Sequence, residues 1–326
     1  MKGRAMSGAA IRNDRPMTAV LLHVAVVLAL VALQYVLPDY HRAVFSRVLV
    51  LAVFAMGYNL AFGYTGLLSL GHAMFFCAGL YGAGMTMSIL GWNVAGGLVA
   101  GIVSGAALAL VIGLLALRTT GVAFMIVTLM FAQVLYLVIL YFNEYTGGDQ
   151  GFSLRPAARQ FGTLDLTDPT TRYFAALALF AAALAVTHAI VRAPRGRVLV
   201  AIRENEDRVR MLGYNVFAAK LAAVVLSGAL CAAAGATYAI LFGYVGATFA
   251  TIQYSILPLL WVLLGGAATA LGPLVGTLFM YYVVDITSNY TTAYLLFVGV
   301  ALILLVLYFP KGVLGTVRER WLPWLP

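Results

Sequence analysis

The sequence predicts an all-α, polytopic integral membrane protein with about eight to ten transmembrane helices. Of its 326 residues, 63% are hydrophobic and 10% are charged, whereas a soluble chain averages roughly 45–50% apolar and about 25% charged residues. The apolar residues also form runs of about 20 residues, the length that crosses a bilayer. The positive charges gather in alternate loops. Together these observations exclude a soluble enzyme, a disordered chain and a nucleic-acid-binding protein.

The apolar runs give ten candidate spans. They cover 18–37, 44–62, 72–90, 94–117, 121–142, 173–191, 218–242, 254–266, 273–286 and 293–309. The first run follows basic residues as in a signal peptide, but it is too long and lacks a small-residue cleavage site, so it is expected to remain as a helix. The runs 254–266 and 273–286 are short and meet at a glycine-rich break, which makes them candidate half-helices.

The positive charges predict which end of each helix is cytoplasmic. If the N-terminus is cytoplasmic, the inner segments hold 15 of the 20 Lys and Arg residues and the outer segments hold five. The acidic residues divide five and five, with Asp285 at a membrane edge. The reverse orientation would violate the positive-inside rule. The net charge of +9 is therefore a topology signal and not a nucleic-acid footprint.

The domain organisation follows from the same count. A single transmembrane domain is expected over 18–309, between cytoplasmic segments at 1–17 and 310–326. Two long loops interrupt it. The outer one covers 143–171 and is rich in turn residues, and the inner one covers 192–217 and holds most of the cytoplasmic charge.

Two glycine-rich breaks interrupt the apolar runs at comparable places in the two halves. Non-helical backbone at membrane depth is tolerated only where protein or a water-filled cavity satisfies its polar groups. Paired breaks of this kind indicate a transport pathway between pseudo-repeats, and two ordinary tight turns on the cytoplasmic side are the alternative. The residues predicted to shape the pathway are Gly63, Gly66, Ser69, Gly71 and His72 in the first break and Gly265, Gly266, Gly272 and Pro273 in the second.

The sequence lacks the residues of an energy source or of an active site. None of the three lysines follows a glycine, so the glycine-lysine pair of a P-loop is missing. Zinc-protease and nucleophile-elbow motifs are missing as well, so neither an enzyme nor a metal site is expected. An ion-coupled carrier would need ionisable groups at mid-membrane. The candidates for such groups are His23, His72, His188 and Asp285.

The inner loop is predicted to form a short amphipathic helix at 198–212. Its apolar residues, ending at Leu212, recur near the 3.6-residue period of a helix, and Gly213 is a C-terminal helix signal. Charges of both signs occupy its polar face, which favours a groove on a cytoplasmic protein over a lipid surface. A solvated loop helix is the alternative. The residues expected at the contact are Ala201, Arg203, Glu204, Asn205, Glu206, Arg208 and Gly213.

Several sequence motifs occur together, in order, between residues 50 and 315. They are GYTGLLSLGHAMFFCAGLYGAG at 63–84, TGGDQG at 146–151, AIRENE at 201–206 followed by Gly213-Tyr214-Asn215, GGAATALGPLVGT at 265–277 and Phe309-Pro310-Lys311-Gly312. This set resembles the LivM-type permease subunits of branched-chain amino acid ABC importers. The run Asp207-Arg208-Val209 departs from the pattern, because related sequences usually have small apolar residues there.

The resemblance implies a multi-pass permease of a bacterial inner membrane with both termini in the cytoplasm. Its implied partners are a second homologous permease, two cytoplasmic ATPase subunits, a substrate-binding protein outside and the lipid bilayer, with no nucleic acid. ATP and Mg would bind the ATPase subunits, so this chain is expected to hold no cofactor. The implied cargo is a branched-chain or other hydrophobic amino acid, with urea, amides or aromatic acids as alternatives. An ion-coupled secondary transporter or channel is the alternative from another class.

Overall fold

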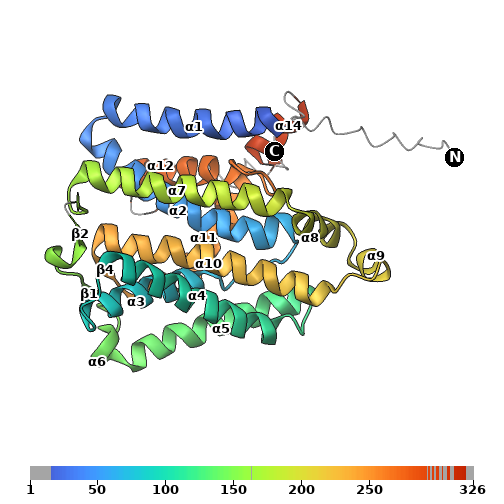
Figure 1. Cartoon of the computed structure of the whole chain (residues 1–326), viewed down its shortest axis with the longest axis horizontal. Helices are drawn as coiled ribbons and strands as arrows, with labels where there is room; N and C mark the ends of the chain where they lie inside the picture. The colour runs from blue at the N-terminus through green and yellow to red at the C-terminus, as the bar shows by residue number, and fades with distance from the viewer. Residues whose placement is uncertain are drawn as a thin grey trace.

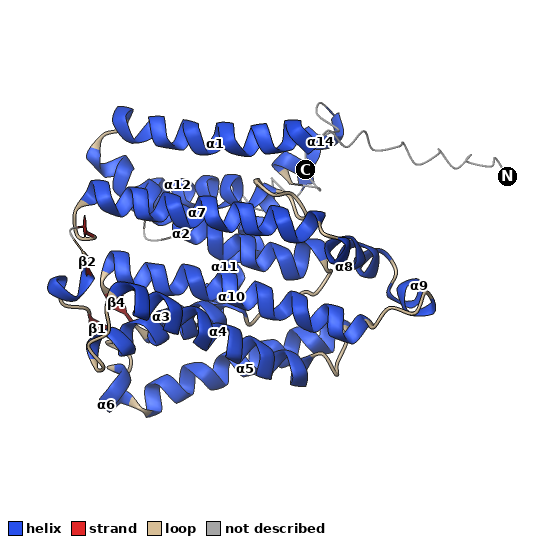
Figure 2. Ribbon diagram, in the orientation of Figure 1, coloured by secondary structure: helices blue, strands red, loops and turns tan. Residues whose placement is uncertain are grey.

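The computed structural model describes residues 16–320 except 163, 292, 294, 295, 297, 298, 301, 302, 304–306 and 309–311. Within this part of the chain almost all regular structure is helical, as predicted, and the long helices lie side by side in one bundle (Figure 2). Ten of the 17 residues of the predicted span 293–309 lie outside the described residues, as do 1–15, 310, 311 and 321–326 of the terminal segments.

The long helices begin and end close to the predicted apolar runs. They are α1 (Pro16–Val36), α2 (Asp39–Asn59), α3 (His72–Ser88), α4 (Val94–Ala116), α5 (Gly121–Tyr141), α7 (Pro169–Arg192), α10 (Val216–Phe242), α11 (Ile252–Gly265) and α12 (Gly272–Tyr290). The shorter helices are the π-helix η1 (Leu60–Tyr64), α6 (Asn143–Thr146), η2 (Pro156–Arg159), α8 (Pro194–Glu204), α9 (Glu206–Met211), η3 (Ala247–Ala250) and α14 (Val313–Arg320).

Five of the described helices are long and apolar enough to cross a membrane. These are α2 together with η1, then α4, α5, α7 and α10, while the apolar stretch Val20–Val36 of α1 and helix α11 are shorter. With 14 residues, α11 measures about 21 Å and falls short of a hydrocarbon layer of about 30 Å. Helix α12 has 19 residues but is not among the described helices that are long and apolar enough to cross a membrane, so the half-helix stays a prediction for it.

Four two-residue strands form two small antiparallel pairs. Strand β1 (Phe152–Ser153) pairs with β4 (Tyr244–Val245), so that Phe152 lies opposite Val245. Strand β2 (Gln160–Phe161) pairs with β3 (Leu164–Asp165). The first pair ties the predicted outer loop to the segment that follows α10.

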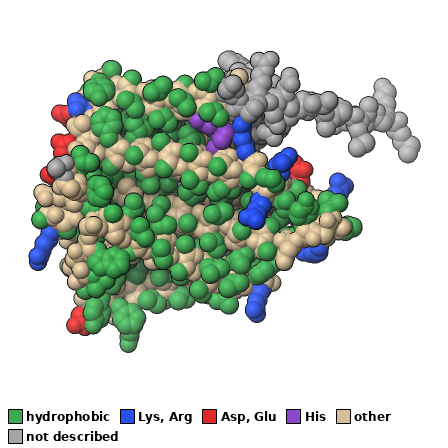
Figure 3. Space-filling view, in the orientation of Figure 1, with side chains coloured by type: hydrophobic (Ala, Val, Ile, Leu, Met, Phe, Trp, Pro, Cys, Tyr) green, Lys and Arg blue, Asp and Glu red, His purple; other side chains and the backbone are tan. Residues whose placement is uncertain are grey.

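The connections between helices divide between two ends of the bundle. The outer loop with α6, β1 and β2 lies at one end, and α8 and α9 lie at the other, together with the first turn of α1 and with α14 (Figure 1). Hydrophobic side chains cover the middle of the visible face, and charged ones gather toward its two ends (Figure 3). The charge count predicts this grouping of the inner loop with the first turn of α1 and with α14.

Helix α2 lies at the centre of the bundle. Within it and η1, 89% of the apolar stretch is buried, against 22% for α5. Around it small residues allow close helix contacts: a Cβ atom at Gly105 of α4 would lie 2.1 Å from Cβ of Ala232 in α10, and one at Gly79 of α3 would lie 2.1 Å from the Ala232 carbonyl oxygen. Helices α3, α4 and α10 therefore pack almost backbone to backbone, as small residues permit in membrane proteins.

The inner loop forms two helices where the sequence predicts one. Asn205 has an extended backbone (φ −161°, ψ 101°) between α8 and α9, and its side chain accepts a hydrogen bond from the backbone N–H of Arg208. Asparagine is a favourable N-cap residue, so it ends one helix and starts the next. Leu212 follows the last residue of α9 and is 75% exposed, whereas Leu199, Ile202 and Val209 of the two helices are buried.

Single cysteines at Gln160 and Asn205 are expected to label from opposite sides of the membrane. Both positions are exposed, and they lie in β2 and between α8 and α9, at opposite ends of the bundle (Figure 1). An impermeant maleimide added to intact cells should label Gln160→Cys and leave Asn205→Cys unlabelled until lysis. The native thiols of Cys77 and Cys231 are buried at 0% exposure and should not react. Labelling of Asn205→Cys alone would reverse the orientation.

Candidate functional site

The two glycine-rich breaks lie against each other at the end of α2, and a single asparagine joins them. The side chain of Asn59, 1% exposed, donates from Nδ2 to the carbonyl oxygen of Thr269 at 2.9 Å. Its Oδ1 accepts a hydrogen bond from the backbone N–H of Ala268, also at 2.9 Å. Both polar groups of the Asn59 amide are therefore used to hold the second break beside the first.

The first break leaves no room for a side chain where it meets Asn59. A Cβ atom at Gly63 would lie 1.9 Å from Oδ1 of Asn59 and 2.7 Å from the backbone nitrogen of Ala268. On the other side of this contact, Ala268 has φ +59°, a left-handed conformation that costs an L-residue roughly 1–2 kcal/mol. The contact between the breaks is thus tight and includes one strained residue.

The segment from Gly66 to Gly71 is non-helical and leads into α3 within the bundle. Tyr58 donates from its hydroxyl to the Ser69 carbonyl at 3.0 Å, Leu70 N–H donates to Thr128 Oγ1 at 3.3 Å, and Gly71 N–H donates to the Ser69 hydroxyl at 3.2 Å. Protein groups therefore satisfy these backbone groups, which is the condition for non-helical backbone at membrane depth. The transport pathway at this break stays a prediction.

His72 begins α3 near the middle of α10 and is 2% exposed. Its Nε2 lies 3.0 Å from the Ser227 hydroxyl, which donates to the Gly57 carbonyl at 2.6 Å. Ser227 must therefore accept from Nε2, and Nδ1 is left buried without a partner among the described atoms. His72 also lines a cavity of about 10 Å³ together with Ser69 and Thr128, the room of about one water molecule.

The second break forms a close contact between α11 and α12. Gly266 has φ +117°, a conformation open to glycine. A Cβ atom at Gly265 would lie 1.8 Å from the Gly272 carbonyl oxygen, and one at Gly276 would lie 1.8 Å from the Trp261 carbonyl oxygen. Pro273 occupies the first turn of α12, where its missing N–H costs nothing. This break is a tight joint between two helices.

The inner loop touches the first break through Arg203 of α8. The Arg203 guanidinium donates from Nη1 to the Gly63 carbonyl oxygen. Its stem lies over Gly66, which has φ +78°, since a Cβ atom there would meet Arg203 Cγ at 3.1 Å. One residue of the predicted coupling segment thus contacts two residues of the predicted pathway.

The rest of the predicted coupling segment divides into buried and exposed parts. Ile202 and Val209 pack with Val216 in a small separate apolar cluster. Glu206 pairs with Lys220 of α10 at 2.5 Å and with Arg210 at 3.0 Å, so its carboxylate serves contacts inside the chain. Gly213 ends α9 at φ +85°, as predicted.

Two predicted contact residues of the inner loop remain free for a partner. Glu204 and Arg208 are exposed, and neither forms an ion pair within the described part of the chain. Backbone groups of the loop are used locally, since Asn205 N–H donates to the Ala201 carbonyl at 2.9 Å. The exposed charges are therefore the part of the loop that another protein could reach.

The other ionisable candidates contact residues of neighbouring helices. The rings of His23 in α1 and His188 in α7 meet edge to face with centroids 4.9 Å apart. Asp285 of α12 accepts a hydrogen bond from the Tyr40 hydroxyl at 2.5 Å, and its position at a membrane edge stays a prediction. Groups of three or more His, Cys, Asp or Glu side chains that could hold a metal ion do not occur in the described segments.

The outer loop is anchored by Arg159. Its guanidinium donates to the carbonyl oxygens of Ile240 and Leu241 in the last turn of α10, where carbonyls lack intrahelical partners. Burial lowers the pKa of Arg159 from its usual value, and the neighbouring charge of Arg172 lowers the pKa further. The loop is thus fixed to the end of the bundle by a cation that caps a helix.

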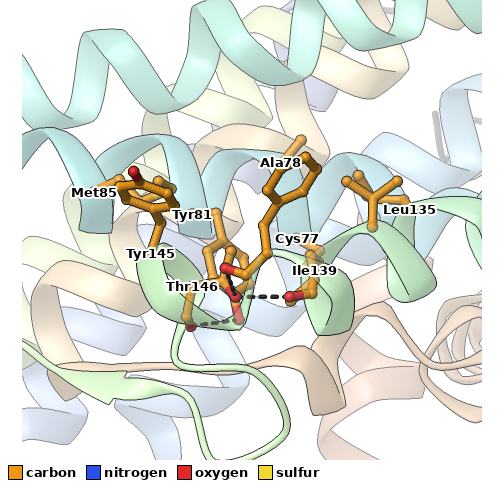
Figure 4. Close-up of a pocket in the computed structure, with 10 residues that line it drawn as sticks. Cys77, Ala78, Tyr81, Met85, Leu135, Ile139, Tyr145 and Thr146 are labelled. Atoms are coloured by element: carbon orange, nitrogen blue, oxygen red, sulfur yellow. Dashed lines mark hydrogen bonds between the residues drawn. The ribbon is translucent and has the colours of Figure 1, made fainter.

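An apolar groove of about 270 Å³ lies between α3, α5 and α6 near the outer loop. Cys77, Tyr81, Leu135 and Tyr145 line it, and Thr146 beside them donates to the Ile139 carbonyl at 2.7 Å (Figure 4). The lining includes no charged side chain. A zwitterionic amino acid would lose its hydration there without gaining partners for its charges, so the groove does not form a complete amino acid site.

Comparison with known families identifies the chain. The family described as branched-chain amino acid transport system, permease component, matches residues 42–307. The chain belongs to this permease family. It is therefore a multi-pass membrane transport component and not an enzyme, and the sequence resemblance is confirmed.

Named relatives of this permease cover most of its length. It is 28% identical over 301 residues to the high-affinity branched-chain amino acid transport system permease protein LivM of Salmonella typhimurium, covering 84% of the chain and 70% of the relative. The LivM protein of Escherichia coli is 28% identical over 294 residues, with 82% and 68% covered. A probable LivM of Methanocaldococcus jannaschii is 28% identical over 141 residues, with 38% and 41% covered. No solved structure matches the permease significantly.

Sequence reasoning missed two residues of the permease that matter at the site. Asn59 lies inside an apolar run and carries no local signal beyond being an amide in a predicted span, where polar groups need a partner. Lys220 lies beyond the predicted inner loop at 192–217, yet it pairs with Glu206. Both act through partners that are distant in sequence or lie across a loop.

Proposed function

We propose that this permease moves branched-chain or other hydrophobic amino acids through a membrane as the transmembrane subunit of an ABC importer. The observation that carries the proposal is the contact between the inner loop and the first break, where Arg203 donates to the Gly63 carbonyl. A permease that is driven by ATP hydrolysis in another subunit needs such a connection between its docking surface and its pathway. The family membership supports the transport role, and the named relatives support the cargo.

The proposed complex contains a second homologous permease, two cytoplasmic ATPase subunits that bind ATP and Mg, and a substrate-binding protein outside. In it, ATP-driven closure of the ATPases displaces the inner loop, and the exposed Glu204 and Arg208 are the charges that an ATPase subunit would contact first. The permease lies in a bacterial inner membrane with both termini inside. Rim charges of this kind set register and orientation, while apolar anchors supply most binding energy.

Reconstitution tests the proposed function. Proteoliposomes that hold the permease pair and the ATPase subunits are expected to take up radiolabelled leucine only when ATP is inside and the binding protein is outside. Urea, acetamide and phenylalanine tested in the same assay separate the alternative cargoes. Uptake that persists without the ATPase subunits and follows a proton or sodium gradient would instead establish an ion-coupled carrier.

A further inference from the structure

We propose that Arg203 and Asn59 form a two-step mechanical link, through which a displacement of helix α8 moves both glycine breaks together. This proposal rests on the proposed function, because it assumes that an ATPase displaces α8. Both residues are positioning residues, since they would act on the pathway backbone and not on the cargo.

The first step of the link runs from α8 to the end of α2. Gly63 lies in η1, in the last turn of the α2 helix, where carbonyl groups lack intrahelical partners. The Arg203 guanidinium fills that role for the Gly63 carbonyl, although the two residues are 140 positions apart in sequence. The Arg203 stem also packs on Gly66. Since charge-assisted hydrogen bonds are about twice as strong as neutral ones, a shift of α8 would be passed to this turn.

The second step runs from the end of α2 to the second break. Asn59 precedes Gly63 by four residues, so the two share one face of the helix. Its amide holds the segment around Ala268 by two hydrogen bonds of 2.9 Å. Two bonds from one planar group fix both the distance and the orientation of the segment, which a single bond would leave free to rotate.

The two steps are connected because Gly63 is packed directly on Asn59. A Cβ atom at Gly63 would fall 1.9 Å from Oδ1 of Asn59. Gly63, whose carbonyl accepts from Arg203, is therefore in close contact with the Asn59 amide, which binds the second break. Packed interiors transmit such displacements because they contain few voids. The π-helical turn η1, Leu60–Tyr64, sits at this point, and such turns frequently mark functional sites.

A double-mutant cycle tests the link in the reconstituted complex. In complexes that have assembled with their ATPase subunits, Arg203→Ala and Asn59→Ala should each lower the leucine taken up per ATP hydrolysed at least about tenfold. If the two residues act in series, the double variant should take up as much leucine per ATP hydrolysed as the more impaired of the two single variants. Independent structural roles would instead multiply the two losses, and that result would overturn the proposal.

Two matched controls accompany the cycle. Arg208→Ala removes an exposed arginine of the same inner loop, and Tyr173→Phe removes a buried hydrogen bond to the Leu30 carbonyl at 2.7 Å, away from the breaks. Tyr173→Phe should leave the uptake per ATP unchanged. Arg208→Ala acts at the proposed docking surface, so it should change ATPase binding without changing the uptake per ATP of the complexes that form.

A labelling experiment tests the same link without any change at the buried Asn59. A cysteine at Ala267, which is partly exposed beside the second break, should react with maleimide at different rates in the ATP-bound and resting complexes. Arg203→Ala should abolish that difference, because α8 no longer moves the break. If the difference survives Arg203→Ala, the link is overturned. A wild-type complex without ATP-dependent uptake would instead contradict the proposed function.

Discussion

Replacing Gly66 with valine is expected to abolish uptake while the protein still inserts into the membrane. Gly66 has φ +78°, so any L-residue there adopts a left-handed conformation at a cost of roughly 1–2 kcal/mol. A Cβ atom would also lie 3.1 Å from Cγ and 3.5 Å from Cα of Arg203. The valine methyl groups would therefore push α8 away from the first break. The measurement is leucine uptake by proteoliposomes that contain equal amounts of assembled complex.

Gly213→Val is the matched control for this substitution. Gly213 has a similar φ of +85°, but a Cβ atom there meets nothing within 4 Å. Its valine variant carries the same backbone strain at the same end of the bundle without displacing Arg203, so it should retain most of the uptake. Equal losses in both variants would assign the effect to backbone strain. Full uptake by Gly66→Val would reduce the first break to an ordinary turn.

Gly272→Val is expected to act differently, although both glycines were predicted from the same pattern. A Cβ atom at Gly272 would lie 2.2 Å from Thr269 Oγ1 and 2.5 Å from the Gly266 carbonyl oxygen. The Gly266 backbone cannot rotate away as a side chain can, so α11 and α12 must move apart. This overpacking should cost about 1–3 kcal/mol or more of stability. Uptake and the melting temperature of the complex should both fall. An unchanged melting temperature would contradict the tight joint.

Breaking α8 while reversing its charges is expected to uncouple the complex. In the triple variant, Ile202→Pro removes a helical hydrogen bond and costs about 3 kcal/mol or more, and it opens the apolar cluster with Val209 and Val216. Arg203→Glu removes the donor to the Gly63 carbonyl. Glu206→Arg places a third cation beside Lys220 and Arg210. The purified complex should lose its ATPase subunits or its substrate-stimulated hydrolysis.

Docking of the binding protein provides the control for this triple variant, because the outer loop lies at the opposite end of the bundle (Figure 1). The binding protein should still bind to the variant complex. Glu204→Arg alone, at an exposed position, should weaken the ATPase contact without opening the apolar cluster. A triple variant that keeps both its ATPase subunits and stimulated hydrolysis would show that the coupling contact lies elsewhere.

The amino-acid sequence predicted the membrane fold because each apolar run by itself indicates a segment that lies in lipid. The helices α4 and α5 begin and end within one or two residues of the runs at 94–117 and 121–142, and Gly213 ends α9 as its position indicated. Burial in lipid requires about 20 apolar residues wherever a helix crosses. Such a requirement can be read from each segment by itself. The local pattern failed at Asn205. It predicts one helix at 198–212, but the Asn205 side chain caps α9 and separates it from α8.

By itself the sequence determined a multi-pass helical permease, its paired glycine breaks and the chemistry of its inner loop. Only the tertiary structure decided that the breaks meet at Asn59, whose partner Thr269 is 210 residues away, and that Arg203 turns toward Gly63. The physical reason is that hydropathy and glycine geometry belong to single segments. A hydrogen bond between distant segments exists only after packing has brought a donor and an acceptor within about 3 Å.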